Sequence, residues 1–175
     1  MKRRDFLTTS LSIAVMPIVG VGAAIPRGAA SGRPDDEIPK FEKPKAYWKT
    51  VLTAPEYVVL FEGATERPYE SPLNDEKRKG TFICVACFLP LFESSKKYDS
   101  GTGWPSFFDV IQGRVGTKLD FLLVLPRTEY HCIRCGGHQG HVFKDGPRPT
   151  GLRYCNNGRA LKFVAAGETL PAWRT

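Results

Sequence analysis

Short hydrophobic segments separated by turn residues dominate the chain from Gly80 onward. The segments are rich in aromatic and β-branched side chains and are bounded by Gly, Pro, Asp or Ser. This punctuation is typical of antiparallel strands. It predicts strands at 81–85, 90–92, 97–99, 107–111, 120–125, 129–133, 141–143 and 161–164. We therefore expect a mainly β fold, and we find no repeat of the solenoid kind.

A helical pattern precedes these strands. Aromatic and aliphatic side chains recur at helical spacing over 47–52, which predicts a first short helix. Thr53 and Glu56 are typical of a helix start, because threonine caps free N–H groups and glutamate reaches back to the cap. With Gly63 as the stop, the pattern predicts a second helix over 55–62.

The first 30 residues have the pattern of an export signal. A basic start with Arg3 and Arg4 precedes a short apolar run that ends in small residues. The adjacent arginines resemble a twin-arginine signal, and an ordinary signal is the alternative. Cleavage after Ala24 or after Ala30 fits the sequence equally well. The run is short and contains Gly and Pro, so we expect export to the periplasm without stable membrane insertion.

Composition divides the chain into four segments. Residues 1–30 are the predicted signal, and the Pro, Gly and charge of 31–44 predict a flexible lead-in. Residues 45–168 form one predicted domain, and 169–175 a short tail. The formal net charge of +7 falls to about +4 without the signal, and the remaining basic residues alternate with acids. A nucleic-acid groove needs clustered charge, so we expect no nucleic-acid partner. We also expect the protein to be a monomer.

Four of the five cysteines form two C-x-x-C pairs, Cys84 with Cys87 and Cys132 with Cys135. Two such pairs on separate hairpins can supply the four thiolates of a structural zinc site. Disulfides are the alternative in an exported protein. The pattern favours zinc, because twin-arginine substrates typically cross the membrane already folded and can load metal beforehand. We expect this ion to contribute folding energy.

Cys155 has no cysteine partner in this pattern. It is either a buried structural cysteine or a reactive thiol. Arg153 lies two residues earlier, so on an extended strand the two side chains share a face. A cation there lowers the pKa of a thiol, and the two asparagines that follow offer amide donors. We interpret Cys155 as a nucleophile.

Proton donors for such a thiol are available nearby. His138 and His141 are candidate acids. Metal ligation by these histidines is the alternative, although four cysteines already complete a tetrahedron. Asp145 could orient an imidazole by bonding its second nitrogen. Trp104, held between Gly and Pro, is either a core residue or the wall of a pocket.

These residues together resemble the methionine-R-sulfoxide reductase family. The matching segments run in the family's order from about residue 47 to 166. They are TERPY (65–69), the two C-x-x-C pairs, DSGTGWPSF (99–107), GHQGHVFKDGPRPTGLRYCNN (137–157) and ALKF (160–163). The resemblance implies a mainly β fold of the Mss4-like or β-tent type. That fold has two small antiparallel sheets, short N-terminal helices and one structural zinc ion.

The resemblance also implies a mechanism. Cys155 would attack the sulfur of methionine-R-sulfoxide and become a sulfenic acid, while His141 protonates the sulfoxide oxygen. His138 and Asp145 would shape that site. The remaining expected site residues are Arg153 and Asn157 in catalysis, and Trp104, Phe107 and Phe143 in substrate binding.

One position departs from the family. Many members have a cysteine where this chain has Thr102, and that cysteine resolves the sulfenic acid as a disulfide. Threonine cannot do so. We therefore expect a thioredoxin-like protein or another external thiol to reduce Cys155, and oxidised exported proteins or peptides to be the substrates.

Two other functions stay open at this point. A non-catalytic, zinc-stabilised ligand-binding module could share the scaffold, but it would leave Cys155, Arg153 and the histidines unexplained. A glutathione-dependent thiol enzyme on a related zinc scaffold is the second alternative.

Overall fold

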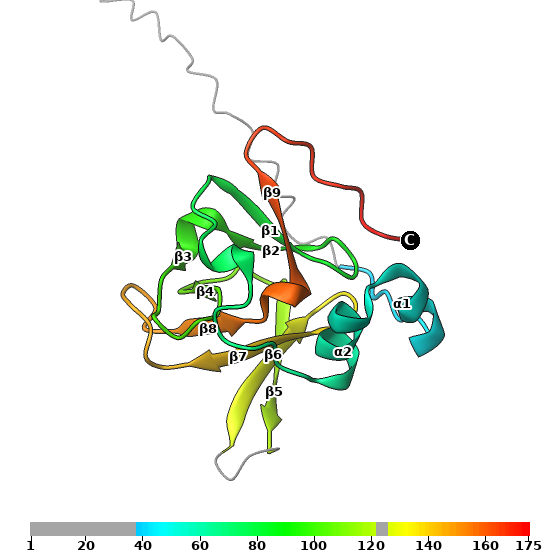
Figure 1. Cartoon of the computed structure of the whole chain (residues 1–175), viewed down its shortest axis with the longest axis horizontal. Coiled ribbons are helices and arrows are strands. Elements are labelled where there is room, and N and C mark those ends of the chain that lie inside the picture. The colour runs from blue at the N-terminus through cyan, green and yellow to red at the C-terminus, as the bar shows by residue number, and fades with distance from the viewer. Residues whose placement is uncertain (1–37, 122–125) are drawn as a thin grey trace, which may run out of the picture. The chain divides into compact units, whose positions relative to one another are not determined.

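The computed structural model describes residues 38–121 and 126–175, which form two antiparallel sheets and two short helices (Figure 1). The predicted export signal lies outside the described residues. The helices are α1 (Lys45–Val51) and α2 (Ala54–Glu62), and the single 3-10 turns are η1 (Pro72–Asn74), η2 (Ser94–Lys96) and η3 (Gly158–Ala160). The strands are β1 (Gly80–Cys84), β2 (Pro90–Glu93), β3 (Lys97–Tyr98), β4 (Ser106–Phe107), β5 (Val115–Asp120), β6 (Arg127–Cys132), β7 (His138–Phe143), β8 (Arg153–Asn156) and β9 (Leu161–Ala165).

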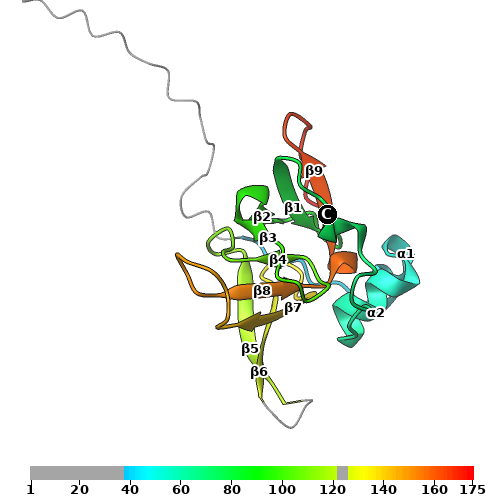
Figure 2. The ribbon, with the colours of Figure 1, turned by 60° about the vertical axis from the view of Figure 1, so that its left-hand side comes forward.

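The strands confirm the predicted fold class. The smaller sheet has the order β2-β1-β9, and the larger has the order β3-β4-β8-β7-β6-β5. All of these pairings are antiparallel. The β5–β6 hairpin extends away from the smaller sheet in both views (Figures 1 and 2).

An aromatic core includes residues of both sheets. Phe107 of β4 stacks on Phe92 of β2 at 4.1 Å and meets Phe82 of β1 at 5.0 Å between ring centroids. Phe107 is fully buried, so the prediction that it binds substrate is wrong. Strand alternation is the reason: Ser106 pairs with Cys155, and the next side chain points to the opposite face.

The predicted helix signals are confirmed. Thr53 and Glu56 form a reciprocal capping box, and Gly63 ends α2 with a left-handed φ of 72°. Trp48 of α1 stacks on Phe61 of α2 at 4.8 Å, which joins the two helices. In the described part of the chain, no helix has the length and apolar character needed to cross a membrane.

Two strands differ from their predicted positions. β5 occupies Val115–Asp120 instead of 120–125, and β4 ends at Phe107 instead of continuing to 111. The sequence of β5, VGTKLD, has no continuous apolar face. Its position is fixed by pairing with β6, which a local pattern does not reveal.

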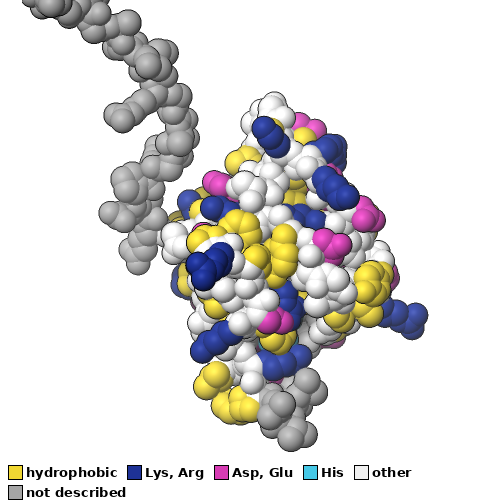
Figure 3. All heavy atoms as spheres, turned by 90° about the vertical axis from the view of Figure 1, so that its left-hand side faces the viewer, with side chains coloured by type: hydrophobic (Ala, Val, Ile, Leu, Met, Phe, Trp, Pro, Cys, Tyr) yellow, Lys and Arg dark blue, Asp and Glu magenta, His cyan; other side chains and the backbone are white. Residues whose placement is uncertain are grey.

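Both ends of the predicted domain extend further than expected. The lead-in was predicted to be flexible to residue 44, but Phe41 is buried and its N–H donates to the carbonyl of Arg134 at 2.7 Å. At the other end, Arg174 Nε donates to the carbonyl of Ala86 at 2.7 Å. Residues 38–44 and 169–175 therefore pack as part of the fold. On the face shown in Figure 3, basic and acidic side chains are interspersed.

Candidate active site and metal centre

A small cavity of about 110 Å³ lies over strands β7 and β8 of the larger sheet. In the register of these strands His141 lies opposite Cys155, and directly paired side chains share a face. The loop before β4 adds Trp104. The cavity is lined by Thr65, Trp104, Arg127, Gly140, His141, Phe143, Cys155, Asn156 and Asn157. The structure thus brings together the predicted nucleophile, the predicted acid and the predicted aromatic wall.

Cys155 is partly buried and is a free thiol. Burial raises the pKa of Cys155 above its usual value, while the nearby Arg153 guanidinium and a hydrogen bond with Thr102 oppose the increase. Arg153 therefore acts in the predicted direction, but the net direction is opposite to the prediction. The reason is that desolvation disfavours the charged form more strongly than these groups favour it.

Arg153 is held in place by Asp145. Its Nε and Nη2 atoms each donate to the Asp145 carboxylate at 2.8 Å, and its guanidinium lies 4.3 Å from the ring centroid of Phe143. The hydrogen bond from Arg153 lowers the pKa of Asp145. Asp145 therefore orients Arg153, and the prediction that it orients an imidazole is wrong.

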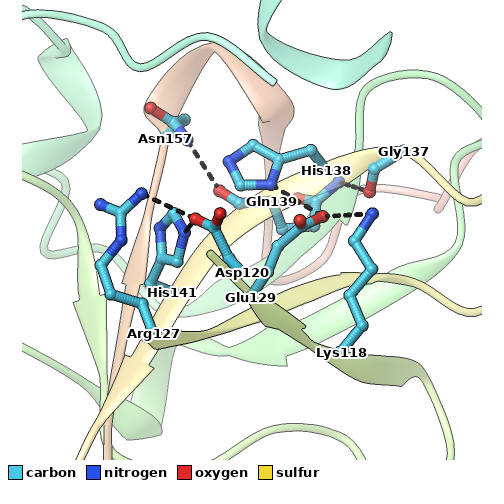
Figure 4. Close-up of polar contacts among 9 residues, drawn as sticks. All are labelled: Lys118, Asp120, Arg127, Glu129, Gly137, His138, Gln139, His141 and Asn157. Atoms are coloured by element: carbon cyan, nitrogen blue, oxygen red, sulfur yellow. Dashed lines mark hydrogen bonds and ion pairs between the residues drawn. The ribbon is translucent and has the colours of Figure 1, made fainter. Parts of the chain in front are cut away.

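The carboxylate that orients His141 belongs to Asp120. His141 Nε2 lies 2.8 Å from Asp120 Oδ2, and Arg127 Nη2 donates to the same oxygen at 2.7 Å (Figure 4). Because Nε2 faces the carboxylate, Nδ1 is the ring nitrogen left for a ligand. Sequence reasoning missed Asp120 and Arg127. They meet only through the register of the β5–β6 hairpin, where the two residues are directly paired.

A second carboxylate–histidine pair, Glu129 with His138, lies beside the pair of Asp120 and His141 (Figure 4). Glu129 Oε1 lies 3.1 Å from His138 Nδ1 and 3.3 Å from Lys118 Nζ. Burial lowers the pKa of His138 despite this carboxylate. Its ring centroid is 5.4 Å from that of His141, and it does not line the cavity. His138 therefore packs beside the predicted acid instead of facing the cavity.

The asparagine amides bond to the protein. Asn157 Oδ1 accepts from the N–H of Glu66 at 3.1 Å, and its Nδ2 donates to the carbonyl of Gln139 at 3.1 Å. Asn156 accepts from the hydroxyl of Tyr130 at 2.6 Å and donates to the carbonyl of Asn157 at 2.7 Å. Both amides thus donate to backbone carbonyls, and neither forms a hydrogen bond with the sulfur of Cys155.

Trp104 forms a wall of the cavity. Its ring is partly exposed, and its Nε1 donates to the carbonyl of Glu66 at 3.1 Å. The Glu66 carboxylate is itself buried and accepts from the backbone N–H groups of Gly158 and Arg159. Glu66 therefore connects the tryptophan to η3 and, through its own N–H, to Asn157.

Four buried cysteines form a separate cluster. The ligand atoms of Cys84, Cys87, Cys132 and Cys135 all lie within 4.8 Å of one another. The Sγ–Sγ distances are 3.7 Å for Cys84–Cys135 and 3.5 Å for Cys87–Cys132. A disulfide would need about 2.05 Å, whereas Zn–S bonds of about 2.3 Å give tetrahedral edges of about 3.8 Å. The cluster fits one structural zinc ion, as predicted.

These features define a small, mainly β protein with four cysteines placed to bind one structural metal ion and a separate cavity lined by Cys155. A family model described as the SelR domain matches residues 52–165. The chain belongs to this family, the methionine-R-sulfoxide reductases, which confirms the resemblance.

Curated relatives agree with this assignment. The "Peptide methionine sulfoxide reductase MsrB" of Methanosarcina mazei is 49% identical over 131 residues, which cover 74% of this chain and 94% of the relative. That of Agrobacterium fabrum is 48% identical over 126 residues, covering 71% and 93%. The "Peptide methionine sulfoxide reductase B1, chloroplastic" of Arabidopsis thaliana is 48% identical over 123 residues, covering 70% and 61%.

Proposed function

We propose that this chain reduces methionine-R-sulfoxide in oxidised proteins or peptides to methionine, with Cys155 as the nucleophile. The observation that carries the proposal is that Cys155, His141 and Trp104 share one cavity, while the other four cysteines form a separate cluster. Family membership and the names of the relatives support sulfoxide reduction as the reaction.

In the first step, the thiolate of Cys155 attacks the sulfoxide sulfur. The S–O bond of the substrate breaks, an S–O bond forms on Cys155, and one proton is taken up by the oxygen. The products are the methionine thioether and the Cys155 sulfenic acid, so two electrons pass from cysteine to substrate. His141 supplies the proton from Nδ1, because the Asp120 carboxylate holds Nε2 and fixes the orientation of the ring.

Aromatic groups select the substrate. Trp104 and Phe143 line the cavity and would hold the methyl end of the side chain. The R epimer then directs its oxygen to His141, whereas the S epimer would direct it to a ring. Arg153, fixed by Asp145, favours the thiolate, and Asn157 braces the cavity wall. A zinc ion held by the four clustered cysteines would stabilise the scaffold and take no part in this step.

An external thiol completes the cycle. Thr102 cannot form a disulfide, and the other four cysteines are buried in their cluster. One external thiol attacks the sulfenic acid and releases water, and a second releases Cys155 from the mixed disulfide. Overall, one sulfoxide and two thiols give one thioether, one disulfide and water. A thioredoxin-like protein or another dithiol fits this role.

The test is an assay of both epimers of N-acetyl-methionine sulfoxide with dithiothreitol, together with the zinc content of the protein. We expect turnover of the R epimer alone and about one zinc per chain, as four thiolate ligands imply. Cys155→Ser should abolish turnover and keep the zinc. Ligand binding without turnover by the wild type would instead favour a binding module. Turnover that requires a glutathione adduct as the substrate would favour the glutathione-dependent thiol enzyme.

We also propose that the chain acts after export, on oxidised proteins of the periplasm. The basis is the sequence of residues 1–30 with Arg3 and Arg4. Replacement of both arginines by lysine should block export if the twin-arginine route is used. Fractionation of the host cells, with the N-terminus of the exported chain read by mass spectrometry, tests the route and the cleavage site together.

A further inference from the structure

Glu66 is a buried acid in a segment that is otherwise exposed. The side chains of residues 65 and 67–70 are exposed to solvent, whereas that of Glu66 is only 6% exposed. Burial of a carboxylate is costly unless hydrogen bonds replace its hydration. A carboxylate that turns inward from such a segment therefore indicates specific partners.

The Glu66 carboxylate binds the turn that follows the strand of the nucleophile. One oxygen accepts from the N–H of Gly158 and the other from that of Arg159 at 3.0 Å. Both N–H groups belong to η3, which begins three residues after Cys155. Gly158 permits this approach, because a Cβ at that position would overlap Ser71 Oγ and lie 3.2 Å from Glu66 Oε1. The carboxylate thus fixes the segment that leaves β8.

The backbone of Glu66 binds two walls of the cavity. Its N–H donates to Asn157 Oδ1 at 3.1 Å, and its carbonyl accepts from Trp104 Nε1 at 3.1 Å. Trp104 and Asn157 line the cavity, whereas Glu66 does not. A residue behind the cavity therefore joins the aromatic wall to the segment that carries Cys155.

We propose that Glu66 is a positioning residue that sets the separation of Trp104 and Cys155, and with it the fit of the sulfoxide side chain. The carboxylate fixes Glu66 against η3, and the carbonyl of Glu66 holds the indole of Trp104. Because the indole is partly exposed, this hydrogen bond restricts its rotation. The effect on sulfoxide binding rests on the proposed function, but the restriction of the indole does not.

Glutamine cannot replace this carboxylate, although it has the same size. The two N–H groups of η3 bind two separate oxygens, and in an amide one of these becomes an NH₂ group, which also donates. Glu66→Gln therefore loses one contact and loosens the residue that holds Trp104. The matched control is Glu70→Gln, the same change at an exposed acid that pairs with the side chain of Arg159.

The first measurement does not depend on turnover. Hydrogen exchange of the Trp104 indole N–H is followed by NMR in zinc-loaded full-length protein, and the resonance is assigned by its loss in Trp104→Phe. In Glu66→Gln the exchange should become about tenfold faster, which corresponds to the loss of one hydrogen bond. In Glu70→Gln it should match the wild type.

The second measurement gives kcat and KM for the R epimer of N-acetyl-methionine sulfoxide with dithiothreitol. Glu66→Gln should raise KM about tenfold and change kcat less than about twofold, because it weakens binding and leaves Cys155 and His141 in place. In a Trp104→Phe background, which lacks the indole N–H, the same change should raise KM by less than about twofold. The contact through which Glu66 acts is already absent there.

Unchanged indole exchange in Glu66→Gln overturns the proposal, and so does an unchanged KM. An equal rise of KM in the Trp104→Phe background also overturns it, because Glu66 would then act without the indole. A fall in kcat and zinc content at unchanged KM would show a role in the fold alone. If Glu66→Gln does not fold, Glu66→Asp, which shortens the side chain and keeps both oxygens, is judged by the same criteria. If the wild type does not reduce the R epimer, the proposed function fails and the indole exchange alone decides the role of Glu66.

Discussion

Thr102 is linked through Ser100 to Ser106, the register partner of Cys155, so a second thiol at position 102 would lie near that sulfur. We predict that Thr102→Cys forms an intramolecular disulfide with Cys155 after one turnover without reductant. The wild type should instead accumulate a sulfenic acid that dimedone traps. Intact-mass and peptide analysis distinguish the two products. An intramolecular disulfide at Cys155 in the wild type would contradict regeneration by an external thiol alone.

Asp120 should matter for catalysis although it does not line the cavity. Asp120→Asn replaces the carboxylate that holds Nε2 of His141 and orients its ring, and we expect kcat to fall about 10²-fold. The matched comparison is Glu129→Gln, which makes the same change from carboxylate to amide in the residue that pairs with His138. Since His138 does not line the cavity, the second variant should lose much less activity. Equal losses in steady-state assays would show that the pairing with His141 has no special role.

Residue chemistry identified one part of this site from sequence and missed another. An unpaired thiol and an imidazole are distinctive residue types, so Cys155 and His141 could be predicted without a structure. Asp120 is one of many acids in the chain, and only the hairpin register brings it to His141. Asp145 is nearer to His141 in sequence, and that proximity misled the prediction.

At the scale of elements, Gln139 of β7 connects the metal cluster to the cavity. Its Nε2 donates to the sulfur of Cys84 at 3.5 Å, and its carbonyl accepts from both the N–H and the Nδ2 of Asn157. Donors to a ligand sulfur tune metal affinity, so Gln139→Leu should lower zinc affinity about tenfold while the fold is kept. Competition with a chelator of known affinity measures this. Gln112→Leu, the same change at an exposed position, is the control.

The elements themselves were predictable to different degrees. Helix α2 was predicted to within one residue at its start, because a capping box and a C-terminal glycine are local signals. Strand β5 was predicted at the wrong residues, because most of its side chains are polar and only its pairing with β6 defines its position. The two C-x-x-C pairs were recognised from spacing alone. The two pairs form one cluster only if the two hairpins lie together in the fold. The C-x-x-C pattern, which is specific for metal ligands, predicted this arrangement.

At the scale of the whole molecule, the two ends of the domain converge on the metal-binding hairpins. Lys40 Nζ donates to the carbonyl of Ile133, and the N–H of Phe41 to that of Arg134. From the other end, the N–H of Arg174 donates to the carbonyl of Cys87 at 3.2 Å, and Arg134 Nη2 donates to the carbonyl of Arg174 at 2.8 Å. Segments that composition assigned to a linker and a tail therefore cover the cluster. Composition alone does not reveal this, because the contacts are backbone hydrogen bonds and single cations that donate to carbonyls.

This arrangement predicts that the C-terminal residues slow the loss of zinc. Deletion of residues 171–175 removes Arg174, which bonds the first C-x-x-C hairpin through its backbone and through its side chain at Ala86. Zinc transfer to an excess of a chromogenic chelator should become faster. Because metal binding contributes to folding, the midpoint of thermal unfolding should fall as well. Arg174→Ala should reproduce part of both effects, whereas Arg148→Ala, at an exposed loop position, should reproduce neither. Unchanged release after the deletion would mean that the tail packs on the hairpins without protecting the ion.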